Sequence, residues 1–73
     1  MAITHQDLDD IFKYHAPNDE QKAQYGVIRD TAKQLAHVIL DNTPPGPDQT
    51  AAIRKLRECV MTANASIALR GRF

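Results

Sequence analysis

The sequence has little of what usually holds a small protein together. It has one cysteine among 73 residues, Cys59, so no disulfide bond can form within the chain. It has no tryptophan, and aromatic residues make up only 5% of it. A single domain of this size buries about 60% of the surface that its unfolded chain exposes, and its core rarely contributes more than ~3–5 kcal/mol of stability. A metal, well-packed helices or a partner chain must therefore supply the rest.

Other absences exclude whole classes of protein. No stretch of about 20 apolar residues occurs, so the sequence predicts no membrane partner and no membrane-spanning helix. Residues 1–7 lack the basic start and apolar run of a signal peptide, and a lone cysteine fits a reducing cytosol. The formal net charge is zero. Because affinity for long nucleic acid grows with the number of phosphates neutralised, this balance argues against DNA as a partner.

The charge that is present is divided unevenly along the chain. Residues 1–43 carry four Lys or Arg against seven Asp or Glu, a net charge of −3. Residues 44–73 carry five against two, a net charge of +3. Halves of opposite charge favour antiparallel packing within one chain or head-to-tail association between chains.

The hydrophobic pattern predicts an all-α chain with one domain over residues 1–73. We expect a short helix over about 4–13, capped by Thr4 and ended ahead of Pro17. A long antiparallel hairpin follows, with helices over about 18–42 and 47–70. Asn18 is the expected cap of the first, the proline-rich turn over 43–47 separates the two, and Gly71 is the expected cap of the last.

The two long helices each carry an apolar stripe with steps of three and four residues. A helix of ~24 residues spans roughly 36 Å, whereas a compact 73-residue globule has a radius of gyration near 11 Å, so the hairpin is a rod. The second long helix is apolar on more than one face, which a two-helix rod cannot cover. We therefore expect a homo-oligomer, the alternative being an adaptor that docks its apolar face on another protein. The stripes are formed by Tyr25, Ile28, Ala32, Leu35 and Ile39, and by Ile53, Leu56, Val60, Ala63 and Ile67.

The chain offers no recognisable catalytic, metal or cofactor motif. The three histidines and Cys59 share no zinc-ligand spacing, and the acidic cluster at Asp7, Asp9 and Asp10 lacks the glycine and glutamate of an EF-hand. The sequence around Cys59 matches neither the motif of a catalytic nucleophile nor a phosphate-binding loop, and a cysteine on a helix is usually a small core residue. An enzyme that degrades a ligand is thus disfavoured, and we expect a binding protein without a cofactor.

Three residues are suited to binding a nucleotide. Tyr14 can stack on a base, Arg29 can bind a phosphate through two N–H groups, and Thr31 can add a hydroxyl. Arg29 and Thr31 stand two positions apart, so strict helical periodicity does not place them on one face. The alternative is a solvated Arg29 and a Tyr14 that packs on the first helix. Gly26 costs a helix interior ~1 kcal/mol relative to alanine, a cost that close approach of a helix or ligand would offset.

These residues stand within longer runs that resemble a known family. The runs are residues 14–17 (YHAP), 25–33 (YGVIRDTAK) and 52–68, which contains the pattern Met-x-Ala-Asn-Ala-x-Ile-Ala. Together with the proline-rich turn they resemble the helical-hairpin domain of bacteriophage anti-CBASS sponges, shared with part of the anti-Thoeris sponges. The resemblance covers about residues 12–70. Family members often have tryptophan where Thr62 stands here, a departure that affects local packing.

The resemblance implies a function. Such sponges bind the cyclic oligonucleotide messengers of bacterial immunity and hold them intact, so that CBASS effectors are not activated in the cytoplasm of the infected host. They form hexamers with pockets for cyclic dinucleotides such as 3′,3′-cGAMP between protomers, and some hold cyclic trinucleotides in separate pockets. The family's dinucleotide site maps onto Tyr14, Arg29 and Thr31, with Gly26 and Lys33 as weaker candidates. Arg70 is a weaker candidate for a trinucleotide pocket.

Overall fold

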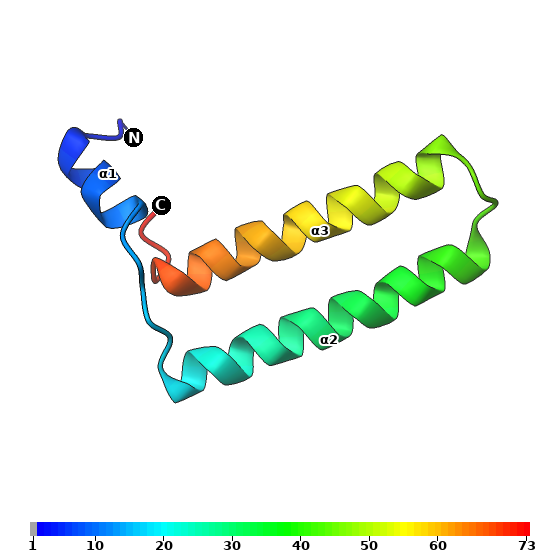
Figure 1. Cartoon of the computed structure of the whole chain (residues 1–73), viewed down its shortest axis with the longest axis horizontal. Coiled ribbons are helices and arrows are strands. Elements are labelled where there is room, and N and C mark those ends of the chain that lie inside the picture. The colour runs from blue at the N-terminus through cyan, green and yellow to red at the C-terminus, as the bar shows by residue number, and fades with distance from the viewer. Residues whose placement is uncertain (1) are drawn as a thin grey trace.

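The computed structural model, which describes residues 2–73, is an antiparallel helical hairpin with a short helix at its open end (Figure 1). Its elements are α1 (His5–Ile11), α2 (Asp19–Asn42) and α3 (Pro47–Ala68). No strand occurs in the described part of the chain, so the predicted all-α hairpin is confirmed. α2 and α3 pack side by side, whereas α1 packs on neither of them.

The predicted helix starts rest on the expected capping residues. The Thr4 hydroxyl accepts a hydrogen bond from the Asp7 N–H at 3.2 Å, and the Asp7 carboxylate accepts one from the Thr4 N–H at 2.9 Å. Asn18 and Gln21 form the same reciprocal pair at the start of α2. Each pair satisfies two backbone N–H groups that a helix start leaves free. Pro47 occupies the first turn of α3, where its missing N–H costs nothing.

Two helix ends differ from the expectation. α1 ends at Ile11, two residues before the expected end near residue 13, where the chain turns back and the His15 ring contacts the carbonyl of Asp10 in its last turn. The His15 Nε2 lies 2.7 Å from the Asp10 carbonyl oxygen, which can only accept, so this nitrogen carries the proton. At the end of α3, Leu69 is the cap and Arg70 itself adopts the left-handed conformation, with φ 55°, ahead of Gly71.

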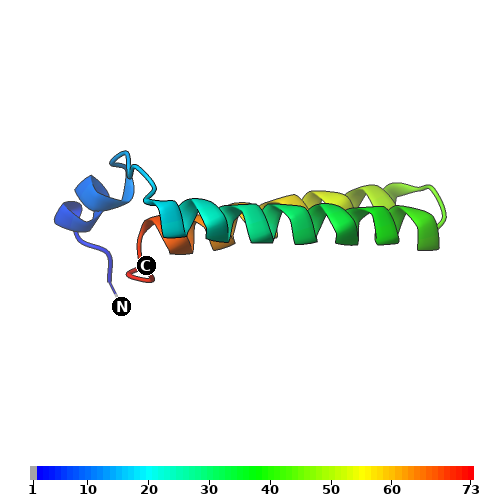
Figure 2. The same cartoon turned by 90° about the horizontal axis from the view of Figure 1, so that it is seen from below.

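The molecule is a flat rod, which Figure 2 shows edge-on. Its extents are 46 × 29 × 18 Å and its radius of gyration is 15.5 Å, against roughly 11 Å for a compact chain of this length. Its accessible surface is 6064 Å², whereas a compact protein of its mass exposes roughly 4,500 Å². No residue among 2–73 is buried. One copy of the chain therefore has packed helices but no closed core.

Candidate ligand-binding surface

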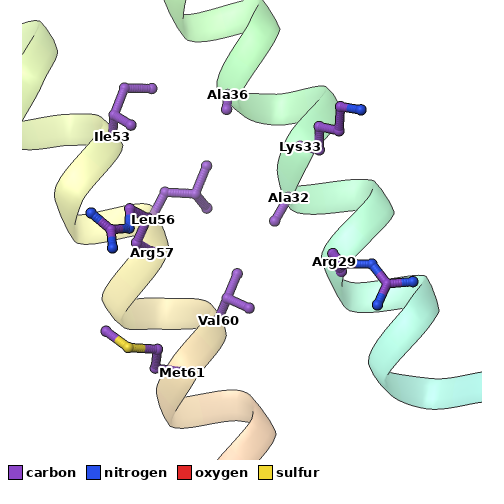
Figure 3. A pocket seen from close by; sticks show the side chains of 9 residues that line it. All are labelled: Arg29, Ala32, Lys33, Ala36, Ile53, Leu56, Arg57, Val60 and Met61. Carbon is purple, nitrogen blue, oxygen red and sulfur yellow. The ribbon is translucent and has the colours of Figure 1, made fainter. Parts of the chain in front are cut away.

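Apolar side chains line both sides of the seam between α2 and α3. Three of them, Ala32, Leu56 and Val60, are exposed to a groove on each side of the hairpin. In Figure 3, Leu56 and Val60 point from α3 toward α2, where Ala32 faces them. The helices thus meet along a narrow row of side chains, and that row stays open to solvent from both faces.

One groove is rimmed by positive charge, and we call it the cationic groove. The guanidinium of Arg29 points away from α3 in Figure 3, while the side chain of Arg57 lies on the opposite flank. Apolar side chains form the floor between them. The cationic groove is lined by Arg29, Ala32, Lys33, Ala36, Ile53, Leu56, Arg57, Val60 and Met61.

The second groove carries no charged residue, and we call it the neutral groove. It contains Thr31, which therefore lies on the other side of the seam from Arg29. This placement agrees with the expectation that two residues two positions apart do not share a helix face. The neutral groove is lined by Val27, Ile28, Thr31, Ala32, Leu35, Leu56, Cys59, Val60 and Ala63.

Arg29 is held loosely and its guanidinium is available to an anion. Its Nε lies 3.7 Å from the Asp30 carboxylate, and the two side chains are 72% and 78% exposed. Exposed pairs of this kind contribute about 0–1 kcal/mol, so a phosphate can displace the carboxylate. A Cβ added to Gly26 would stand 3.6 Å from the Arg29 Nη2, an ordinary contact distance. Gly26 therefore leaves bare backbone beneath the guanidinium.

Tyr14 lies in the segment between α1 and α2, beyond the start of the hairpin (Figure 1). Its side chain is 82% exposed, so it does not pack on α1, and the alternative weighed for it from the sequence is wrong. Arg29 follows the start of α2 by ten residues, which is roughly 15 Å of helix. Within one copy, Tyr14, Arg29 and Thr31 are thus not brought together.

The weaker candidates are also separated. Lys33 stands one turn beyond Arg29 on the rim of the cationic groove. Arg70 is exposed at the open end of the hairpin, where the left-handed backbone makes it the turn residue after α3. This end is fastened by a hydrogen bond from the Gln21 side-chain amide to the Ile67 carbonyl oxygen, at 3.1 Å. Arg70 therefore lies closer to the start of α2 than to either groove centre.

The described residues contain no group of three or more His, Cys, Asp or Glu side chains placed to hold a metal ion. None of the helices over residues 2–73 is long and apolar enough to cross a membrane. The polar groups that line the two grooves are the three cations of the cationic groove and, in the neutral groove, the Thr31 hydroxyl and the Cys59 thiol. Cations above an apolar floor are suited to binding an anionic molecule that also has an apolar surface.

Fold and surface together define a class: a small helical hairpin with an apolar seam open on both faces and polar residues dispersed around it. A sequence model of the family described as "Acb2/Tad1, hairpin domain" matches residues 3–68, and the chain belongs to this family. No curated protein and no solved structure matches it in the corresponding comparisons. The family consists of phage anti-defence sponges that bind cyclic oligonucleotides and act by binding inside the host cell.

Proposed function

We propose that this sponge sequesters cyclic dinucleotides, such as 3′,3′-cGAMP, in pockets shared between copies of a homohexamer, and so blocks activation of CBASS effectors. The observation that carries the proposal is the separation of Tyr14, Arg29 and Thr31 within one copy. A ring that contacts all three must lie between two copies. The open seam on both faces of the hairpin supports such an assembly.

The symmetry of the ligand supports a shared pocket. A cyclic dinucleotide carries two phosphates and two bases related by a near two-fold axis. A two-fold interface between identical chains presents each residue twice. Two copies of Arg29 then meet two phosphates, and two copies of Tyr14 face two bases. Since only two ligand charges need matching, the zero net charge of the chain is no obstacle.

A cyclic trinucleotide is the second ligand class that we propose, at a separate place. Arg70 is exposed and lies at the open end of the hairpin, away from both grooves. Its left-handed backbone sets the direction of the Cα–Cβ bond at the end of α3. Titration with a panel of cyclic di- and trinucleotides, in the presence of saturating dinucleotide, tests whether the two classes occupy different sites.

The direct test of sequestration is the chemical state of the bound messenger. We expect 3′,3′-cGAMP incubated with the protein to be withheld from a CBASS effector and to be recovered as an intact ring after the complex is denatured by heat. The reason is that members of this family act by binding, and that the cationic groove offers cations to the phosphates of the ring. Chromatography of the released ligand decides the matter, and linear product would favour an enzyme.

Replacing Tyr14 by alanine should weaken cyclic dinucleotide binding by about 1–3 kcal/mol, the range for stacking of an aromatic ring on a base. The side chain is 82% exposed in one copy, so its loss should leave the helix content unchanged. Tyr14→Phe keeps the ring and is the matched control for stacking. Calorimetry that finds equal affinity for all three proteins would remove Tyr14 from the pocket.

A further inference from the structure

The short helix α1 carries an apolar face that its own chain covers only in part, since Ile11 is half-buried whereas Phe12 is largely exposed. Leu8, Ile11 and Phe12 stand at positions i, i+3 and i+4, and therefore on one side of the helix. Leu8 is 39% exposed and Phe12 is 83% exposed. α1 packs on neither α2 nor α3. Besides its own capping residue Thr4 and the His15 ring that follows it, the side-chain link between α1 and the rest of the described chain is one ion pair, in which the Arg72 Nη2 lies 2.9 Å from the Asp10 Oδ2.

The cationic groove has the complementary character. Its floor is apolar, and two of its rim residues, Lys33 and Arg57, form no ion pair with any described residue, while Arg29 meets only the exposed Asp30. Along α2 the groove runs from Arg29 to Ala36, a distance of roughly 10 Å. An acidic helix of about two turns with one apolar face would match its length, its charge and its floor.

We propose that the cationic groove of one copy of this chain binds α1 of a second copy. α1 has seven residues and is therefore roughly 10 Å long. It carries three carboxylates, of which Asp10 is already paired with Arg72. Asp7 and Asp9 would then meet Lys33 and Arg57, the two groove cations without an ion pair in the described chain, and Arg29 stays available to a ligand phosphate. Leu8, Ile11 and Phe12 would cover the apolar floor.

This arrangement also places the proposed ligand contacts together. Tyr14 follows Phe12 by two residues, so an α1 that lies in the groove of a second copy carries its own Tyr14 to that copy's Arg29. The inference thus deepens the proposed function, since it rests on the shared pocket and names the two surfaces that build it. Calorimetry measures the affinity for 3′,3′-cGAMP separately from assembly. If the protein binds the ligand but α1 does not lie in the groove of a second copy, the inference is wrong and the proposed sequestration is unaffected.

The test pairs two single-cysteine chains. Both carry Cys59→Ser, which removes the one native thiol, an exposed one. One chain is isotope-labelled and has Phe12→Cys, and the other has Ala36→Cys in the groove floor. The matched control has Val27→Cys in place of Ala36→Cys. Val27 stands nine residues earlier on α2, half a helical turn around, and is 67% exposed.

After mild oxidation of the mixed chains, mass spectrometry measures the labelled–unlabelled disulfide. We expect about tenfold more of it with Ala36→Cys than with Val27→Cys, because a disulfide forms only where Cα atoms come within about 7 Å. Accessibility alone would favour Val27, so the result does not follow from exposure. Equal yields, a higher yield at Val27, or no mixed disulfide at all would each overturn the proposal.

A charge exchange makes the test independent of cysteine placement. Asp9→Arg and Arg57→Glu should each weaken assembly about fivefold, as expected for a rim ion pair turned into a like-charge contact, and the two changes together should restore it. Arg54→Glu is the control, since Arg54 is exposed on the same helix and lines neither groove. Sedimentation measures the assembled fraction. Additive losses in the double variant would place α1 elsewhere.

Discussion

Replacing Arg29 by alanine is expected to weaken cyclic dinucleotide binding by about 2–5 kcal/mol, the cost of removing one member of a desolvated charge pair. The guanidinium is 72% exposed in one copy and has only the exposed Asp30 beside it. Exchanging that carboxylate for a phosphate therefore costs the guanidinium little interaction energy. In a two-fold pocket the change removes two phosphate contacts at once. Isothermal titration with 3′,3′-cGAMP measures the effect.

Two further variants make this result specific. Arg54→Ala removes the same side chain from an exposed position that lines neither groove, and we expect its affinity to match that of the unaltered protein. Arg29→Lys keeps the charge but loses the fork of N–H groups that binds a phosphate in two places, so its affinity should be intermediate. Equal affinities for Arg29→Ala and Arg54→Ala would remove Arg29 from the site.

The helix starts could be predicted because their causes are local in sequence. Thr4 with Asp7 and Asn18 with Gln21 form their hydrogen bonds within three residues, and Pro47 is suited to a first turn by its own ring. The ends depend on contacts from residues further on. α1 ends where the His15 ring turns back onto it. α3 turns at Arg70, although glycine is the usual residue at that position and stands one place later.

The candidate site, too, could be predicted from the sequence only in part. Periodicity correctly indicated that Arg29 and Thr31 do not share a face, and the resemblance to known sponges, not the pattern, selected them. Periodicity could not show that the seam is open on both sides, since that depends on how α2 and α3 are rotated about their axes. Nor could it show that Tyr14 is free of α1, because that follows from the turn at His15.

Loss of the Leu56 side chain is expected to destabilise the protein by about 2–5 kcal/mol, the range for leucine-to-alanine changes in a covered core. In one copy Leu56 is only half-buried and is open to both grooves, a setting that by itself would give a smaller loss. The full effect requires other copies to cover the seam. Since about 1 kcal/mol lowers the Tm of a domain this small by about 4–8 °C, the Tm of the Leu56→Ala protein should be lower by about 8 °C or more.

The same measurement reports assembly, because folding coupled to association makes the Tm rise with protein concentration. Light scattering should give a mass several times that of the 8.2 kDa chain. Leu40→Ala is the control. Leu40 is 55% exposed, lies near the turn of the hairpin and lines neither groove, so its loss should change stability by no more than about 0.5 kcal/mol. A Tm independent of concentration, with a Leu56→Ala loss no larger than that of Leu40→Ala, would show that single hairpins are stable alone and that no copy covers the seam.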